Sequence, residues 1–121
     1  MFSYYYGYEA EQFLFYRIPK LLVTEKCFHS LSTDAKLLYG LMLDRMSLSI
    51  KNGWTDDLGR VYIYFPIEEV MELLHCKSEK ATRLMTELDS KKGIGLIERV
   101  RQGQGKPSII YVKNFVSRLP P

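Results

Sequence analysis

The sequence has few of the residues that cross-link small proteins or bind metals. Among its 121 residues are only two cysteines, Cys27 and Cys76, and two histidines. Two cysteines so far apart give no disulfide framework, and we expect both to be reduced, buried and inert. His75 and Cys76 offer two adjacent metal ligands, but the other candidates, Cys27 and His29, lie about 45 residues earlier and not at zinc spacing. We therefore expect no metal site.

Long apolar segments are also absent. No run approaches the roughly 20 apolar residues that a membrane-spanning helix requires. Residues 1–8 are rich in tyrosine but lack the basic cluster and apolar stretch of a secretory signal. Hydrophobic residues make up 46% of the chain and charged residues 26%, which is typical of a globular protein of one domain. These features predict a soluble, cytoplasmic protein that makes no membrane contact.

The motifs of common enzymes are missing. No glycine-rich loop leads to a phosphate-binding lysine, and no serine or cysteine stands in a motif that would orient a base. The acidic pairs Asp56–Asp57 and Glu68–Glu69 could hold a nuclease metal, but they fall in a predicted turn and in the first turn of a predicted helix. Because structural roles explain both pairs, we expect no enzymatic activity and no cofactor.

The positive charge is concentrated in one part of the chain. The net charge of the whole chain is only +3, which alone does not indicate nucleic acid. Residues 77–113, however, contain nine Lys and Arg against four Asp and Glu, a net charge of +5, so the remainder carries −2. An ordinary solvated face could also look like this. The segregation nevertheless favours a polyanion-binding surface in the carboxy-terminal third.

The amino-terminal half predicts a short strand and a long helix. The aromatic and aliphatic run at 13–18 is stopped by Pro19, which favours a strand. Residues 20–28 are too brief a pattern to assign. A helix is expected from about Thr33 to about Lys51, because its apolar residues recur at intervals of three and four. Ser32, Thr33 and Asp34 can cap its start, and Asn52–Gly53 can end it.

Five features are expected in the remaining sequence. They are a strand over 60–65, a short helix over 66–75, a tight turn, a second helix that Ser78 caps and that stops near Lys92, and a hairpin of two strands over 96–102 and 108–113. Gly103–Pro107 supplies the hairpin turn. This order predicts an α+β winged helix-turn-helix, with a helical core, a small antiparallel sheet and a carboxy-terminal β-hairpin as the wing.

The second helix of the pair is the expected recognition helix. At 100° per residue, Ala81, Leu84, Met85 and Leu88 share the buried face. The candidates for DNA contact come from the other faces and from the amino-terminal end: Lys77, Ser78, Glu79, Lys80, Thr82, Arg83 and Thr86. Arg83 is the best base-reading candidate, because its planar fork can bond two acceptors of guanine, and a threonine could meet a thymine methyl. An ordinary solvated helix face would show the same pattern.

The hairpin supplies the second group of candidates. Arg99 and Arg101 lie two residues apart on one strand face, and Lys106 lies at the tip, within reach of phosphate or minor groove. We expect these cations to position the protein on DNA rather than to specify sequence. Gln102, Gln104 and Ser108 are neutral candidates for phosphate or groove contacts, although the same residues also fill ordinary hairpins.

Seven segments resemble the RepA replication-initiator family of Gram-positive plasmids. They are IPK at 18–20, LSxDAKLLYG at 31–40, DRMxLS at 44–49, NGW at 52–54, GRVYIYF at 59–65, GLIER at 95–99 and GQGKP at 103–107, where x marks a position outside the resemblance. The resemblance implies a winged-helix domain at the amino terminus that binds repeated sites, or iterons, in a plasmid origin, usually as a homodimer. It also implies a separate carboxy-terminal domain that engages host replication proteins and that this chain lacks.

The expected organisation is therefore a tyrosine-rich arm over 1–12, the winged helix over 13–115 and the start of a linker over 116–121. For dimerisation we single out Phe13 and Phe15, with ordinary core packing as the alternative. Three functions stay open: an origin-binding initiator, a transcriptional repressor with the same module, and a winged helix that contacts only proteins.

Overall fold

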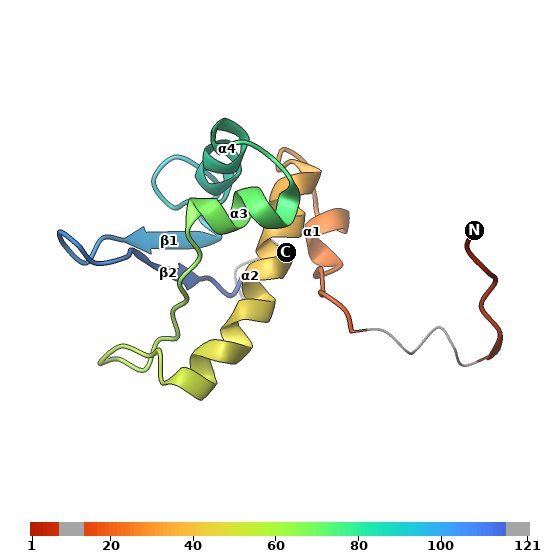
Figure 1. Cartoon of the computed structure of the whole chain (residues 1–121). Helices are drawn as coiled ribbons and strands as arrows, with labels where there is room; N and C mark the ends of the chain where they lie inside the picture. The colour runs from red at the N-terminus through yellow and green to blue at the C-terminus, as the bar shows by residue number, and fades with distance from the viewer. Residues whose placement is uncertain (8–13, 116–121) are drawn as a thin grey trace.

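The computed structural model describes residues 1–7 and 14–115 of the chain. Its elements are α1 (Leu21–Thr24), the 3₁₀ turn η2 (Lys26–Phe28), α2 (Thr33–Asn52), α3 (Ile67–Leu74), α4 (Ser78–Leu88), β1 (Ile97–Val100) and β2 (Ile109–Val112). The other helices gather around the amino-terminal part of α2, and the β1–β2 hairpin projects from them to one side (Figure 1). No helix in the described ranges is long and apolar enough to cross a membrane.

The long helix α2 forms as its sequence predicts. The Ser32 hydroxyl accepts a hydrogen bond of 3.1 Å from the backbone N–H of Ala35, which satisfies one of the free donors at the helix start. Gly53 ends the helix in the left-handed conformation, with φ of 70°. The buried apolar residues of α2 lie in its amino-terminal half, at Ala35 and from Leu38 to Met42.

One hydrophobic core joins all the helices to the hairpin. Its buried side chains include Leu22 of α1, Leu38 and Met42 of α2, Val70 of α3, Leu84 and Leu88 of α4, Ile97 of β1 and Ile110 of β2. The core is closed at one end by Phe115, whose ring lies 5.0 Å from that of Phe28 and 5.8 Å from that of Tyr39. Burial of these side chains holds α4 and the wing on a common base.

The prediction of a regular strand over 60–65 is wrong. Only Ile63 pairs with the hairpin, through two backbone hydrogen bonds of 2.8 and 2.9 Å with Ile110. The carbonyl of the preceding residue, Tyr62, accepts instead from the buried Ser49 hydroxyl of α2 at 2.6 Å. Val61 forms only an isolated bridge with Thr55, so the segment makes separate contacts with three parts of the chain and no regular strand.

The amino-terminal strand is not formed either. No strand forms over residues 14–18, and Phe13 lies outside the described residues. The segment crosses α2 at Gly40, where an added Cβ would lie 2.3 Å from Ile18 Cδ1 and 2.9 Å from the Arg17 carbonyl oxygen. A local apolar pattern favours an extended backbone, but a strand also needs an available partner edge. Within the described residues this segment packs on a helix.

Helices α3 and α4 form the predicted pair with a tight turn. His75 ends α3 in the left-handed conformation at φ of 52°, and the backbone N–H of Cys76 donates to the Met71 carbonyl at 3.1 Å. The predicted cap by Ser78 is wrong, because Ser78 is the first helical residue and the preceding residue, Lys77, is extended. No side chain caps the start of α4, so its first N–H groups point outward without a cap.

Helix α4 ends at Leu88, four residues before the predicted end at Lys92. Asp89 is extended and forms a backbone bridge to Ile97, which starts the return of the chain toward β1. The turn that follows is compact: the backbone N–H of Gly93 donates to the Asp89 carbonyl at 2.9 Å. Lys91 and Lys92 thus belong to this turn and not to the helix.

The hairpin forms as predicted, with β1 and β2 antiparallel and Arg99 opposite Ile110. Its turn depends on glycine, since Gly103 and Gly105 have φ of 116° and 79°. Helix, turn, helix and hairpin therefore follow one another as in a winged helix-turn-helix, and the α+β prediction is confirmed.

The two cysteines are free, but they are not both buried as predicted. Cys27 is exposed and Cys76 is partly buried. Cys27 lies in the three-residue turn η2, which turns Phe28 into the core and leaves its neighbour outside.

Candidate nucleic-acid interface

Helix α4 divides into the two faces that its sequence predicts. Ala81, Leu84, Met85 and Leu88 are all buried. The predicted contact residues occupy the other side: Lys77, Ser78, Glu79, Thr82 and Arg83 are exposed, and Lys80 and Thr86 are partly exposed. The amino-terminal half of the helix therefore presents polar and basic side chains to solvent.

Two of these side chains are positioned for contact with an external partner. Arg83 is exposed and forms no ion pair within residues 1–7 and 14–115. The Thr86 hydroxyl donates to the Thr82 carbonyl at 2.9 Å, so its polar group is satisfied within the helix. The Thr86 methyl is the part of the side chain left for an apolar contact.

Polar contacts fix α4 on the start of α2. Glu87 accepts two hydrogen bonds of 2.8 Å, one from the backbone N–H and one from the hydroxyl of Ser32. At the other end of α4, the Lys80 ammonium lies 2.6 Å from the Asp34 carboxylate. Because this pair is nearly half exposed, it contributes little stability. Both contacts set the rotation of α4 about its axis, and Lys80 reaches an external partner only by leaving Asp34.

Arg99 lies on the helix-facing side of the wing. It stands opposite Ile110, which is buried, and cross-strand partners share a face. Its guanidinium meets the nearly buried Asp89 carboxylate, with Nε and Nη2 at 2.6 and 2.5 Å from Oδ2. Burial raises the pKa of Asp89, but the hydrogen bonds and charge of Arg99 outweigh it and hold that pKa below its usual value. The pair joins the end of α4 to the wing.

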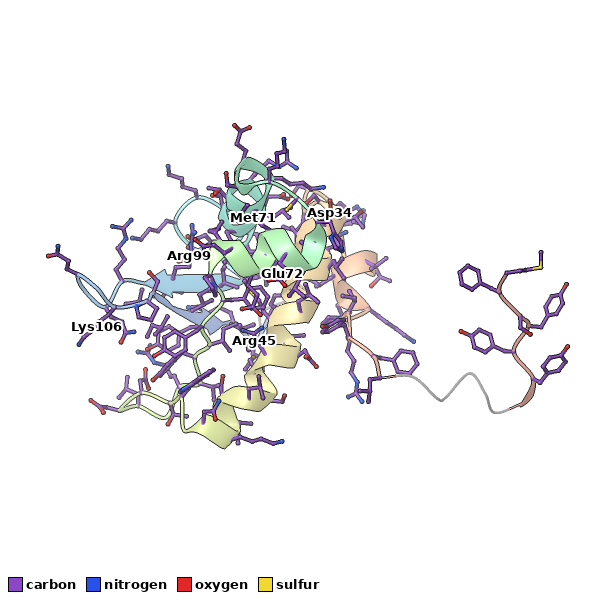
Figure 2. All side chains as sticks on the ribbon, in the orientation of Figure 1. Asp34, Arg45, Met71, Glu72, Arg99 and Lys106 are labelled. Atoms are coloured by element: carbon purple, nitrogen blue, oxygen red, sulfur yellow. The ribbon has the colours of Figure 1, made fainter. Side chains whose placement is uncertain are left out.

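The other predicted wing residues lie toward the tip. Arg101, Gln102, Gln104, Lys106 and Ser108 are all exposed. Gln102 donates to the Pro107 carbonyl at 2.8 Å and so links the two arms of the hairpin. Figure 2 shows Lys106 at the far end of the hairpin, whereas Arg99 lies near the helices.

The opposite side of the wing carries a separate structural cluster. Asp56 accepts hydrogen bonds from the backbone N–H groups of Leu58 and Arg60, the Arg60 guanidinium and the Tyr111 hydroxyl, at 2.7 to 2.9 Å. Burial raises the pKa of Asp56, but these bonds outweigh it and lower the pKa to about 2. The first acidic pair thus has a structural role through Asp56, as predicted.

The charges on the described surface leave a positive excess on α4 and the wing. Of the nine cations between residues 77 and 113, three have acidic partners: Lys80 with Asp34, Arg99 with Asp89, and Lys113 with Glu98 at 3.2 Å. The other six are exposed and form no ion pair in the part of the chain that the structure describes: Lys77, Arg83, Lys91, Lys92, Arg101 and Lys106. This surface can attract a polyanion.

Sequence reasoning missed two of these six cations and the acid that orders their surroundings. Lys91 and Lys92 were assigned to the end of the recognition helix and were not among the predicted contacts. The Lys-Lys pair directly before Gly93 was the available signal, because such a pair at a helix end also fits a basic turn. Nothing in the sequence pattern indicated that Asp89 pairs with Arg99. Among the described residues, no group of three or more potential metal ligands comes together.

The chain is similar in sequence to a curated protein and to solved structures of DNA-binding proteins. A 41 kDa protein of Lactobacillus helveticus is 39% identical over 90 residues, which are 74% of this chain and 25% of that protein. The chain thus spans a quarter of the length of this curated relative. The solved N-terminal domain of a DNA-binding protein is 36% identical, with a TM-score of 0.74 over 94% of this chain and 85% of its own. A solved Rep–DNA complex is 37% identical, with a TM-score of 0.73 over 93% and 84%.

The family model described as the N-terminus of replication initiator protein A (RepA) matches residues 14–119. That range includes every element from α1 to β2. The chain therefore belongs to the family of RepA replication-initiator N-termini.

Proposed function

We propose that this chain binds duplex DNA sequence-specifically at iterons of a plasmid replication origin and so takes part in initiating plasmid replication. The family and the similar Rep–DNA complex support this proposal. The observation that carries it is the set of six exposed cations without acidic partners in the described residues, all on α4, the following turn and the wing. No catalytic step is proposed.

The two parts of this surface have different roles in the proposal. Helix α4 enters the major groove with its amino-terminal half, where Arg83 can form two hydrogen bonds with guanine and Thr82 or Thr86 can contact a thymine methyl. The wing follows the sugar-phosphate backbone, with Lys106 and Arg101 as its main cations. Arg99 and Lys80, which are already paired, contribute mainly to the placement of these elements.

Variants at Arg83 and Lys106 separate the two roles. Arg83→Ala is expected to weaken binding to the origin repeat more than binding to scrambled duplex. The difference between the two binding free energies should shrink by about 1 to 3 kcal/mol, and the preference at particular base pairs should relax. Lys106→Ala is expected to weaken both duplexes alike and to reduce the salt slope by about 1. Lys51→Ala removes an exposed cation at the far end of α2 and should change neither.

The measurement is the dissociation constant for both duplexes as a function of salt. Equal loss on repeat and scrambled DNA for Arg83→Ala would refute the assignment of Arg83 as a base-reading residue. If all three variants bound like the unaltered chain, α4 and the wing would not be the DNA-binding surface.

We also propose that the chain acts as a homodimer, which would place two recognition helices on neighbouring half-sites. Phe15 supports a contact near the amino terminus, because its side chain is 63% exposed although it is aromatic. Phe13 lies outside the described residues. Sedimentation of the unaltered chain and of Phe15→Ser tests this contact, and an unchanged association state in the variant would contradict it.

Contacts with host replication proteins are proposed for the region of the longer relatives that this chain does not span. The tyrosine-rich arm over 1–12 and the linker over 116–121 likewise stay predictions, since 8–13 and 116–121 lie outside the described residues.

A further inference from the structure

A hollow opens between the turn that follows α4 and the base of the wing. It has a volume of about 550 Å³, and its lining includes Lys91 from the turn, Arg99 and Arg101 from the first arm of the hairpin, and Ser108 from the second arm. We propose that this hollow, the turn–wing notch, binds one phosphate group of the DNA backbone, with Lys91 and Arg101 as its cationic ligands. The inference rests on the proposed DNA binding and adds a site to it.

The charges around the notch leave these two cations uncompensated. Two acids also line it, Asp89 and Glu98. The Asp89 carboxylate is already engaged by both Nε and Nη2 of Arg99, and Glu98 pairs with Lys113. Within the described residues, Lys91 and Arg101 have no acidic partner. An anion in the notch therefore meets two free positive charges and two acids that are already neutralised.

The turn that carries Lys91 has a defined backbone. Besides the bond from Gly93 to Asp89, the backbone N–H of Ile94 donates to the Glu87 carbonyl at 2.9 Å. Gly93 packs so closely on the end of α4 that an added Cβ would lie 2.2 Å from the carbonyl oxygens of Thr86 and Glu87. The turn is therefore folded back on α4, and Lys91 projects from a backbone whose position is set before any ligand binds.

The opposite wall of the notch is also held in place. Arg99 faces the helices and is fixed by Asp89, so it acts as a wall rather than as a ligand. Arg101 follows two residues later, beyond the end of β1, and Ser108 lies across from it with an exposed hydroxyl that can donate to a phosphate oxygen. The notch thus gathers two cations and one neutral donor between the recognition helix and the wing, where a backbone strand must pass if both contact the same duplex.

The neighbouring lysine provides a matched control. Lys92 has the same charge, is also exposed and lies in the same turn, but it does not line the notch. We expect Lys91→Ala to weaken binding of origin-repeat and scrambled duplex alike, by about five- to tenfold near physiological salt, which corresponds to one solvent-exposed hydrogen bond. Arg101→Ala should act similarly, and Lys92→Ala should weaken both duplexes measurably less than Lys91→Ala does, because it removes only general surface charge.

A double variant tests whether the two cations share one phosphate. The slope of log K against log salt is negative, and loss of one neutralised phosphate reduces its magnitude by about 0.9. We expect the double variant with Lys91→Ala and Arg101→Ala to reduce this magnitude by about 0.9 in total. A fall of about 1.8 would mean two separate phosphates and would overturn the shared site. Equal effects of Lys91→Ala and Lys92→Ala would overturn it as well, because they would show only the general charge of the turn.

DNA binding by the unaltered chain distinguishes a failure of the notch from a failure of the proposed function. If the unaltered chain fails to bind duplex DNA, the proposed function fails and the notch loses its ligand. If it binds and prefers the repeat while the lysine variants behave alike, only the notch is refuted. Melting temperatures check that the exposed substitutions leave the fold intact.

Discussion

The contact between Asp89 and Arg99 gives the most informative prediction about how the wing is held. Asp89→Asn removes the negative charge but keeps the size of the side chain. The carboxylate is nearly buried, accepts a hydrogen bond from Arg99 Nε and forms an ion pair with Nη2, while the Arg99 side chain is 33% exposed. A hydrogen bond to a charged group is worth about 1.5 to 3 kcal/mol, and loss of a buried partner costs more. Since asparagine can still accept one bond and Arg99 can regain water, we expect destabilisation of about 2 kcal/mol.

Thermal unfolding tests this value directly. For a domain of about 100 residues, 1 kcal/mol shifts the melting temperature by about 4 °C or more, so the variant should melt about 8 °C lower near neutral pH. The contribution of Asp89 is present above its unfolded pKa, ordinarily 3.8, and is lost as the pH falls through its lower folded value. The difference between the two proteins should therefore shrink below about pH 4. A shift under about 1 °C at neutral pH would refute a structural role for the pair.

DNA affinity is a second measurement on Asp89→Asn. A simple charge effect and a loss of wing position change this affinity in opposite directions. Asp89→Asn makes the interface more positive, so electrostatics alone predicts tighter binding. If the pair positions the wing against α4, specific binding should instead weaken, by about tenfold or more for a misplaced element. Glu79→Gln is the matched control, because it removes an exposed acid from α4 that has no ion-pair partner among the described residues. Tighter binding by both variants would refute the positioning role.

Three other perturbations test the remaining contacts. Gly93→Ala places a Cβ against two carbonyl oxygens at 2.2 Å, so it should lower stability by about 1 to 3 kcal/mol in urea unfolding; an unchanged midpoint would contradict the described turn. Glu87→Ala leaves the start of α2 without its two acceptors from α4 and should cost about 1 to 2 kcal/mol by the same method, more than Glu79→Ala at an exposed site. Asp56 should titrate near pH 2 by nuclear magnetic resonance, and the destabilisation by Asp56→Asn should fade as the pH drops from about 4 to about 2; a midpoint near 4 would contradict its hydrogen bonds.

Helices α2, α3 and α4 and the hairpin were predictable from sequence because their signals are local. The buried stripe of α4 follows from Leu84 and Leu88 at a helical spacing, and the end of α2 follows from Gly53, which adopts the left-handed conformation. The wing follows from two β-rich runs separated by glycines. Each of these features depends on neighbours within a few residues, so a single sequence contains enough information to place them.

The features that were mispredicted depend on distant partners. The end of α4 is set by Asp89, whose backbone bridges to Ile97 and whose carboxylate meets Arg99. The run at 60–65 forms only isolated bridges, and side chains of α2 bind its Tyr62 and Tyr64 carbonyls. Spacing and residue type do not report such tertiary contacts.

The same limit applies to the candidate site. Sequence alone indicated that the carboxy-terminal third is basic, but not which cations have acidic partners. In the sequence, Arg99 and Lys80 are equivalent to Arg83 and Lys106. In the structure, Arg99 pairs with Asp89 and Lys80 pairs with Asp34. The reverse holds for Lys91, which is exposed without an acidic partner in the described residues but was not among the predicted contacts. Pairing of charges between elements therefore decides which members of a basic patch are available to a ligand.

The most direct test of the proposed function is a salt titration of the unaltered chain with origin-repeat duplex and with scrambled duplex of the same length. Both affinities should fall steeply as salt rises, because six exposed cations lie on the proposed surface. The proposal predicts that the repeat is bound about a thousandfold or more tightly than the scrambled duplex at physiological salt. Equal, weak binding of the two duplexes would contradict it and would favour a domain that contacts proteins.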